Sequence, residues 1–434
     1  MVIIQLLIVL LALYAGSRYG GLALGAMSGI GLAILVFCFG FAPGNPPTEV
    51  IYIIIAAVTC AGFLQAAGGM DWLVQLAERL LRKHPDRITF LAPFSTFFLT
   101  VLVGTGHVMY TLMPIIVDIS LKNGIRPERP CAVSSIASQV GITCSPIAAA
   151  VVSFVLISGQ NGYDFTILQV LAVTLPASII GLFLASLCSY KRGKDLDKDP
   201  EFQEKIADPS YRKYVYDNTE TVLDRKISRS AKLSVYIFLG TILSIVLLAA
   251  FGYKKVPMNI VIQIVMLVAA SLMAILCKAD PKEAVHGKVW QSGMVAVVAI
   301  FGVAWMADTF LGNYMDVFKD SLGSFVASYP WAIAFVFMAV SVLINSQGAT
   351  VIAMLPLAYS LGVPGYVLLG VLPSVYAYFI IPTYPSDLAT VNFDRSGTTR
   401  IGKYLLNHSF LMPGLVSVGT ATVVGLLLST LFYA

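Results

Sequence analysis

The chain has 434 residues, of which 58% are hydrophobic and only 12% are charged, and its mean hydropathy is +0.83. Soluble domains carry about 25% charged residues, so this composition excludes an ordinary soluble protein and predicts an all-α integral membrane protein. The net charge of +5 is spread over loops, which argues against nucleic acid as a partner. The six cysteines form no CxxC pair and indicate no metal site.

The first part of the chain, residues 1–190, is predicted to contain five spanning segments. An amphipathic, charged piece follows the third of them at 71–87, and two half-length apolar arms come next, joined by Gly104-Thr105-Gly106. The arms, about 89–103 and 107–121, would form a hairpin at about 89–121. Apolar spans lie at about 2–17, 21–41, 48–68, 131–157 (interrupted at 141–146) and 165–190.

Residues 191–232 are polar, with 11 Lys/Arg and 9 Asp/Glu, and predict a cytoplasmic linker that is helical in part. Residues 233–434 then repeat the earlier order. Two short arms at 331–344 and 349–361 predict a second hairpin, and a second amphipathic piece at 311–328 precedes them. Apolar spans lie at about 233–253, 258–277, 291–310, 366–391 (interrupted at 381–386) and 409–433.

Landmarks recur in the same order in both parts: Gly106 and Pro114 correspond to Gly348 and Pro356. Lys and Arg mark cytoplasmic loops, and basic loops flank the first pair of arms on both sides. The arms must therefore enter and return on one side, as a re-entrant hairpin. Each repeat then has five crossings, and because five is odd, the second is inverted and both termini are periplasmic.

One charged pair, Lys254 and Lys255, falls on the outer side and violates this topology. Inverted repeats with discontinuous helices are typical of secondary transporters whose site lies near the midplane.

The interrupted segments also indicate what the site binds. No Lys or Arg lies deep in a predicted span, so an anion would be held by hydroxyls, backbone N–H groups and helix N-termini. Each repeat offers two such N-termini, one after a hairpin tip and one after a helix break. Two facing anion sites would fit a short dicarboxylate. The candidate substrate-binding residues are Gly104, Thr105, Gly106, His107, Thr143, Ser145, Pro146, Asn345, Ser346, Gln347, Gly348, Thr350, Thr383, Tyr384, Pro385 and Ser386.

Four residues are candidates for coupling or gating, because ionisable groups in apolar segments are functional by default. They are His107, Asp308, Asp387 and Arg400. Plainer interpretations stay open: a buried hydrogen-bonded histidine, an interfacial Asp308, an N-cap at Asp387 and a topology anchor at Arg400. No cofactor is predicted.

The motifs resemble a known family, the anaerobic C4-dicarboxylate (Dcu) transporters of bacteria. They run along the whole chain: Gly68-Gly-Met-Asp-Trp-Leu73, Gly104-Thr-Gly106, Ser145-Pro-Ile-Ala-Ala-Ala-Val151, Gly302-Val-Ala-Trp-Met-Ala-Asp-Thr-Phe310, Pro382-Thr-Tyr-Pro385 and Gly397-Thr-Thr-Arg-Ile-Gly-Lys403, with Asn407-His408 after them. The resemblance implies transport of fumarate, succinate, malate and aspartate across the inner membrane, with fumarate exchanged for succinate in anaerobic respiration. It also implies an elevator-type homodimer, and for some members work with a fumarate-sensing histidine kinase.

The leading hypothesis is therefore a C4-dicarboxylate antiporter that works by alternating access. A sodium- or proton-coupled symporter is the alternative, motivated by His107 and Asp387. An intramembrane enzyme is disfavoured because the sequence has no HExxH and no Ser/His pair that we can place on facing helices. A channel is disfavoured because broken helices in both repeats suit alternating access better. A purely sensory protein is disfavoured because the 42-residue linker is short for a signalling domain.

Overall fold

The structure is a computed structural model of the chain that describes residues 1–19, 22–217, 220–250, 256–382, 384–402 and 406–434. Within these residues all regular secondary structure is helical, apart from an isolated β-bridge between Ile401 and His408. Eight of the described helices are long and apolar enough to cross a membrane. The predicted class, an all-α integral membrane protein, is confirmed.

The helices follow the predicted segments in order. Nine precede the linker: α1 (Val2–Tyr19), α2 (Leu22–Ala33), α3 (Thr48–Ala66), α4 (Gly69–Lys83), α5 (Ile88–Val103), α6 (Met109–Lys122), α7 (Glu128–Val140), α8 (Ala149–Gln160) and α9 (Ile167–Ser189). The linker carries α10 (Pro200–Ile206) and α11 (Pro209–Tyr216). Nine follow it: α12 (Arg229–Ala250), α13 (Met258–Leu276), α14 (Pro281–His286), α15 (Lys288–Ser328), α16 (Ile333–Ile344), α17 (Gln347–Ser360), α18 (Gly365–Val371), α19 (Pro385–Phe393) and α20 (Leu411–Tyr433).

Local sequence explains where several helices begin. The short helices α10, α11 and α14 each start with proline directly after an aspartate, Asp199, Asp208 or Asp280. Each carboxylate accepts a hydrogen bond from the N–H two residues later, and proline fits the first helical position because its missing N–H has no partner there. A capping box between Thr166 and Gln169 starts α9 in the same way.

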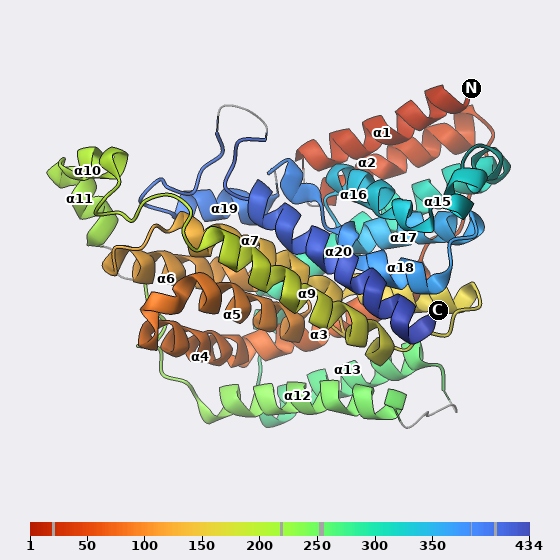
Figure 1. The fold of residues 1–434 in the computed structure, drawn as a ribbon. Coiled ribbons are helices and arrows are strands. Elements are labelled where there is room, and N and C mark those ends of the chain that lie inside the picture. The colour runs from red at the N-terminus through yellow and green to blue at the C-terminus, as the bar shows by residue number, and fades with distance from the viewer. Residues whose placement is uncertain (20–21, 218–219, 251–255, 383, 403–405) are drawn as a thin grey trace.

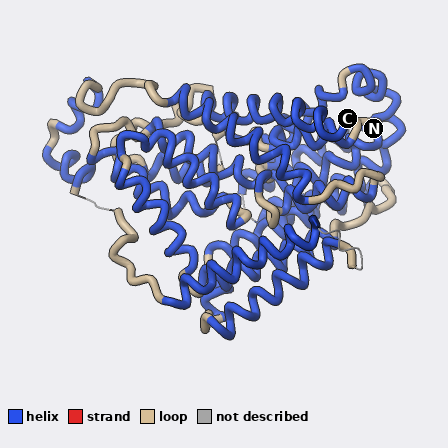
Figure 2. Tube along the Cα trace, turned by 60° about the horizontal axis from the view of Figure 1, so that its bottom comes forward, coloured by secondary structure: helices blue, strands red, loops and turns tan. Residues whose placement is uncertain are grey.

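The helices are arranged around α3 and α15. Helix α15 packs on α2 and α3, and α3 also packs on α13. Figure 1 shows α1 with α2 on one side of the molecule and α12 with α13 on the opposite side, with the interrupted segments between them. Both termini lie at the end of the molecule opposite α10 and α11 (Figure 1), and Figure 2 shows both at one end after a 60° turn.

Helices α5 and α6 form a hairpin that returns to the end from which it started. The guanidinium of Arg82, in the last turn of α4 and six residues before α5, lies 3.2 Å from the carboxylate of Asp118, near the end of α6. The open ends of the two arms are therefore neighbours, and residues 104–108 form the tip. In the second half, α16 and α17 pack on each other and are joined at residues 345–346.

Two predicted boundaries differ from the structure. The amphipathic piece predicted at 311–328 begins slightly later: within α15, non-helical backbone at Tyr314 (φ −123°, ψ 15°) forms a kink that separates it from the preceding span. Asn313 Nδ2 donates to the Thr309 carbonyl oxygen at 2.8 Å and to the Ala42 carbonyl oxygen at 3.0 Å, so it competes for a helical acceptor just before the kink.

The second helix break is also longer than predicted. Helix α18 ends at Val371 and α19 begins at Pro385, whereas the sequence indicated a break at 381–386. Pro373 cannot donate a helical hydrogen bond, and the unwound Ala377 N–H donates instead to Ser341 Oγ of α16 at 2.9 Å. Lys254 and Lys255 lie outside the described residues.

Candidate functional site

The first hairpin turns at Gly104, whose φ of +78° lies in the left-handed region that favours glycine. The next residue, Thr105, is extended and caps the following helical turn. Its hydroxyl oxygen accepts a hydrogen bond from the His107 backbone N–H (3.2 Å) and also contacts His107 Nδ1. The tip therefore ends in a helix N-terminus at residues 106–108.

The second hairpin repeats this local structure. Asn345 is left-handed (φ +54°), a conformation that asparagine tolerates better than most residues. Ser346 is extended and caps α17, with its hydroxyl accepting from Ala349 N–H at 3.4 Å and its carbonyl from Thr350 Oγ1 at 2.8 Å. Both tips thus consist of a left-handed residue, an extended hydroxyl residue and a new helical turn.

The two helix breaks present further N-termini. After α7, a 3-10 turn at Gly141–Cys144 and an extended stretch lead to α8, whose N-cap is Ala148; the N-cap of α19 is Tyr384. Neither residue supplies a side-chain cap. The first N–H groups of a helix have no partner inside it, so α8 can offer donors to a ligand. Helix α19 offers fewer, because Pro385 has no N–H and the Asp387 N–H donates to the Tyr384 carbonyl oxygen at 3.0 Å.

A cavity of about 150 Å³ lies where the tips and breaks meet. All four helix starts contribute residues to its lining, and α19 does so through its N-cap residue alone. These residues are Gly106 and His107 of the first tip, Gln347 and Gly348 of the second, Ala149 and Ala150 of α8, and Tyr384 before α19. The predicted residues Gly104, Thr105, Asn345 and Ser346 also line it.

A buried hydrogen-bond network connects the two halves beside this cavity. Gln347 Nε2 donates to the Gln139 carbonyl oxygen at 2.8 Å and lies 3.3 Å from the Tyr378 hydroxyl. The Tyr378 hydroxyl in turn donates to Gln139 Oε1 at 2.7 Å. A Cβ on Gly106 would lie only 2.4 Å from Gln139 Nε2. Because Gln347 bonds to the backbone carbonyl of Gln139, both hairpin tips meet at this residue.

Sequence reasoning missed Gln139, which is 2% exposed. It lies among several serines of α7, and no local pattern in the sequence distinguishes its role from theirs. The only signal was its place immediately before the first helix break, at the end of a helix that is buried along its whole length.

The remaining wall of the cavity comes from α3 and α15 and was not predicted either. Small and apolar residues recur there at helical spacing, so one face of each helix meets the cavity. They are Ile54, Ala57, Val58 and Ala61 of α3, and Val289, Ser292, Gly293, Ala296 and Ile300 of α15.

The cavity holds little formal charge. Within the described residues no Lys, Arg, Asp or Glu lines it, and His107 is joined only by Tyr378 and Tyr384 as titratable lining groups. Lys288, which is exposed, directly precedes the lining residue Val289. A bound anion would depend mainly on backbone N–H groups and helix dipoles.

Six predicted residues surround the cavity without lining it: Thr143, Ser145, Pro146, Thr350, Pro385 and Ser386. Several stabilise the turns that form it. Thr143 Oγ1 donates to the Val140 carbonyl at 3.2 Å, and Thr350 bonds the Ser346 carbonyl as described. Thr383 lies outside the described residues.

Asp308 lies away from this cavity, where it holds the loop between α2 and α3. Its Oδ2 accepts from Asn45 N–H at 2.8 Å, and the neighbouring Thr309 hydroxyl accepts from Gly44 N–H at 2.9 Å. Trp305 Nε1 donates to the Gly44 carbonyl at 2.7 Å. These contacts give Asp308 a structural role.

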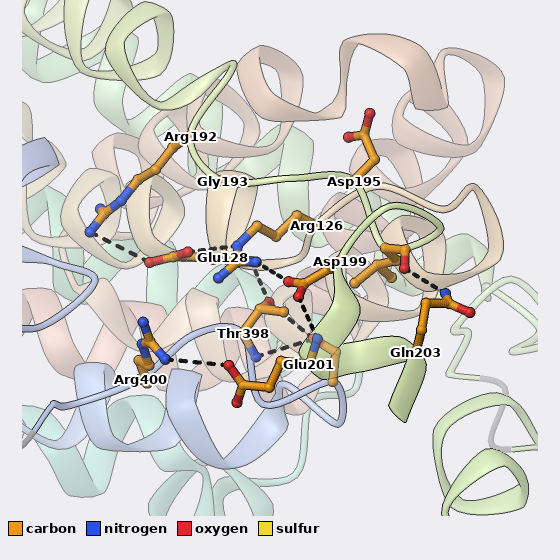
Figure 3. A network of polar contacts seen from close by, with 12 residues as sticks. Arg126, Glu128, Arg192, Gly193, Asp195, Asp199, Glu201, Gln203, Thr398 and Arg400 are labelled. Atoms are coloured by element: carbon orange, nitrogen blue, oxygen red, sulfur yellow. Dashed lines mark hydrogen bonds and ion pairs between the residues drawn. The ribbon is translucent and has the colours of Figure 1, made fainter. Parts of the chain in front are cut away.

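Arg400 belongs to a network of ion pairs at the end of the molecule that carries the linker (Figure 3). Its guanidinium is 59% exposed and lies 3.9 Å from Glu201 of α10. Deeper in the network, Glu128 at the start of α7 accepts from Arg126 Nε at 2.8 Å and lies 3.5 Å from Arg192. The network attaches the linker to α7 and to the loop before α20, rather than to the cavity.

Asp387, in the first turn of α19, is 1% exposed and lies behind the cavity lining. Its Oδ1 accepts a 2.6 Å hydrogen bond from Ser135 Oγ, so it connects α19 to α7. Among the described residues, Oδ2 has no hydrogen-bond partner. A buried carboxylate oxygen without a partner is costly, so the Oδ2 side of Asp387 is not stabilised by any hydrogen bond from the described residues.

The described residues contain no group of three or more His, Cys, Asp or Glu that could hold a metal ion.

The family model described as "Anaerobic c4-dicarboxylate membrane transporter" matches residues 1–433. The anaerobic C4-dicarboxylate transporter DcuB of Escherichia coli O6:H1 is 47% identical over 440 residues, covering 99% of this chain and 98% of that protein. The C4-dicarboxylate transporter DcuA of Wolinella succinogenes is 36% identical, with 99% of each chain covered.

Two solved structures of membrane transporters share the fold. MtrF of Neisseria gonorrhoeae, which is described with a class of antimetabolite efflux pumps, has a TM-score of 0.52 at 13% identity and covers 93% of this chain and 84% of its own. The YdaH transporter of Alcanivorax borkumensis has a TM-score of 0.51 at 12% identity, and the match covers 92% of this chain and 87% of the YdaH chain. At these identities the likeness concerns the fold alone.

Proposed function

Because the chain belongs to the family of anaerobic C4-dicarboxylate membrane transporters, and is thus a multi-pass transporter and not an enzyme, we propose that it works as a secondary active antiporter. It takes up fumarate, malate or aspartate across the bacterial inner membrane and releases succinate. The exchange proceeds by alternating access, as part of anaerobic respiration.

The observation that carries this proposal is the convergence of four helix N-termini on one cavity. A helix N-terminus stabilises a nearby negative charge by about 0.3–1 kcal/mol at an exposed site and by up to ~2 kcal/mol when it is partly buried. Four of them offset part of the cost of removing two carboxylates from water. Since they come from both halves of the chain, each carboxylate of a C4 acid can meet its own pair.

The size and polarity of the cavity also suit a small diacid. Its 150 Å³ is below the roughly 300–1,000 Å³ of sites for drug-sized ligands. The uncapped N-terminus of α8 supplies donors for a carboxylate. The buried amide oxygens of Asn345 and Gln347 have no partner among the described residues, so they can accept from the hydroxyl of malate or the ammonium of aspartate.

The transport step in this proposal is a movement of the hairpins and broken helices against α3 and α15. The lining faces of α3 and α15 are small and apolar, which suits sliding because few hydrogen bonds would have to break. We propose that residues 1–190 and 233–434 are inverted repeats with both termini periplasmic; the matching tips at 104–105 and 345–346 and the position of both termini at one end support this. Homodimerisation and contact with a fumarate-sensing histidine kinase rest on the family resemblance.

A second candidate function is sodium- or proton-coupled symport of the same acids. The unpartnered Oδ2 of Asp387 favours it, because a cation bound there would lie behind the cavity and between the two broken helices.

Counterflow in proteoliposomes separates the two candidates. Vesicles loaded with unlabelled succinate and empty vesicles receive labelled fumarate, with and without sodium and pH gradients. The proposal predicts uptake only with internal succinate. Uptake into empty vesicles that requires a gradient would contradict antiport and support symport.

A further inference from the structure

A second hollow lies at the open end of the first hairpin, far along α5 and α6 from the cavity at their tip. Its volume is about 880 Å³. It is bounded by the start of α5, the loop after α6, the start of α7 and the first residues of the linker. Its lining includes Thr89, Asn123, Arg129, Tyr190 and the linker residues 191, 193–195 and 198.

The hollow has an excess of positive charge. Lys191, Lys194 and Lys198 line it and are exposed, and none of the three has an ion-pair partner among the described residues. The lining acids are already paired: Asp195 lies 2.7 Å from Arg129, and Asp86 lies 3.6 Å from Arg87. Three lysine ammonium groups are therefore free to meet an anion.

The hollow also adjoins a surface suited to lipid. Tyr190, which lines it, lies beside Phe90 with the two rings tilted (centroids 5.6 Å apart), and Phe90 lies beside Phe183 of α9 in the same way (5.8 Å). Phe183 and Leu187 are large exposed apolar residues on α9, a candidate membrane span. Aromatic side chains at the end of a span mark the headgroup level of a bilayer, and the basic loops here mark the cytoplasmic leaflet.

We infer that this hollow binds the phosphate headgroup of an anionic glycerophospholipid, with the acyl chains along the aromatic face of α9. Basic pockets beside spanning helices on the cytoplasmic side are suited to such headgroups. The volume accommodates a headgroup with its glycerol. A free phosphate ion would use the same lysines but gain nothing from Phe183 and Tyr190.

Native mass spectrometry of the purified transporter, titrated with phosphatidylglycerol, phosphatidylcholine or sn-glycerol 3-phosphate, tests this site. Each lysine near an anionic headgroup contributes about a fivefold change in affinity. The variant K191Q/K194Q/K198Q should therefore bind phosphatidylglycerol at least tenfold more weakly. The control K213Q/K226Q/K282Q removes three exposed lysines outside the hollow and should stay within twofold of the wild type.

Stronger binding of phosphatidylglycerol than of phosphatidylcholine, lost only in the first variant, supports the inference. Equal binding of the two lipids, or unchanged binding by the first variant, overturns it. Equal affinity for sn-glycerol 3-phosphate overturns the lipid assignment in favour of a soluble phosphate. Thermal unfolding of both variants without lipid shows that they fold alike, and phosphatidylglycerol should raise the unfolding temperature of the control alone.

Discussion

Replacing Gly106 with alanine tests whether the substrate cavity depends on close contact between the first hairpin tip and α7. The added methyl group would lie 2.4 Å from Gln139 Nε2 and 2.8 Å from the Ser138 carbonyl oxygen. The second atom belongs to a helix backbone and cannot move aside. The tip must then withdraw by roughly 0.5 Å to reach an ordinary C···O separation of about 3.3 Å.

Such overpacking costs about 1–3 kcal/mol, and it falls on the residues that border the cavity. If the cost is borne by the substrate-bound arrangement, affinity for the C4 acid decreases by about 5- to 150-fold. The assay is the succinate-dependent rise in unfolding temperature, together with counterflow of labelled fumarate. Gly419→Ala is the matched control, because Gly419 lies within α20 and a Cβ there would meet nothing within 4 Å.

The control should remain within twofold of the wild type in both assays. The reasoning is refuted if Gly106→Ala folds normally and also binds succinate and exchanges fumarate within twofold of the wild type. Loss of folded protein in both variants would also contradict it, because the surroundings of Gly419 leave room for a methyl group.

Three other substitutions give further predictions. Gln347→Ala removes the amide that bonds the Gln139 carbonyl and leaves buried groups without partners, at a cost of about 1–3 kcal/mol; the unfolding temperature and the affinity for succinate should both decrease, and a change in neither would oppose the network's role. Asp387→Asn should keep fumarate–succinate counterflow within a fewfold of the wild type if exchange needs no coupling cation, whereas its abolition would favour symport. Arg400→Gln should leave exchange within twofold, since an exposed ion pair contributes about 0–1 kcal/mol; a tenfold loss would instead assign Arg400 to gating.

The parts of the site that could be predicted from the sequence are those with a local signal. Gly104 and Asn345 occur where the chain reverses direction between two helices. Thr105 and Ser346 are of residue types that commonly cap the next helical turn. Such signals depend on a few neighbouring residues, and they located both hairpin tips. Proline marked the first helix break at Pro146 in the same way.

The parts that could not be predicted depend on contacts between distant segments. Gln139 meets Gln347 across 208 residues, and nothing in the composition of α7 distinguishes it from its serine neighbours. The hydrogen bond between Asp308 and the backbone of Asn45, 263 residues away, is likewise a contact that no local pattern indicates. The second break was placed too late because residues 372–380 are mostly apolar. Their backbone forms two short 3-10 turns, and between these turns the Ala377 N–H donates to Ser341 of α16.

A structure of the transporter with succinate bound tests the central claim most directly. We predict one succinate in the cavity between the hairpin tips, with its carboxylates within hydrogen-bond distance of backbone N–H groups at the starts of α8 and α17 and at residues 106–108. Density for succinate at another place, such as the basic hollow beside Lys194, would contradict the claim. So would an empty cavity at saturating succinate, because the four helix N-termini would then have no ligand to stabilise.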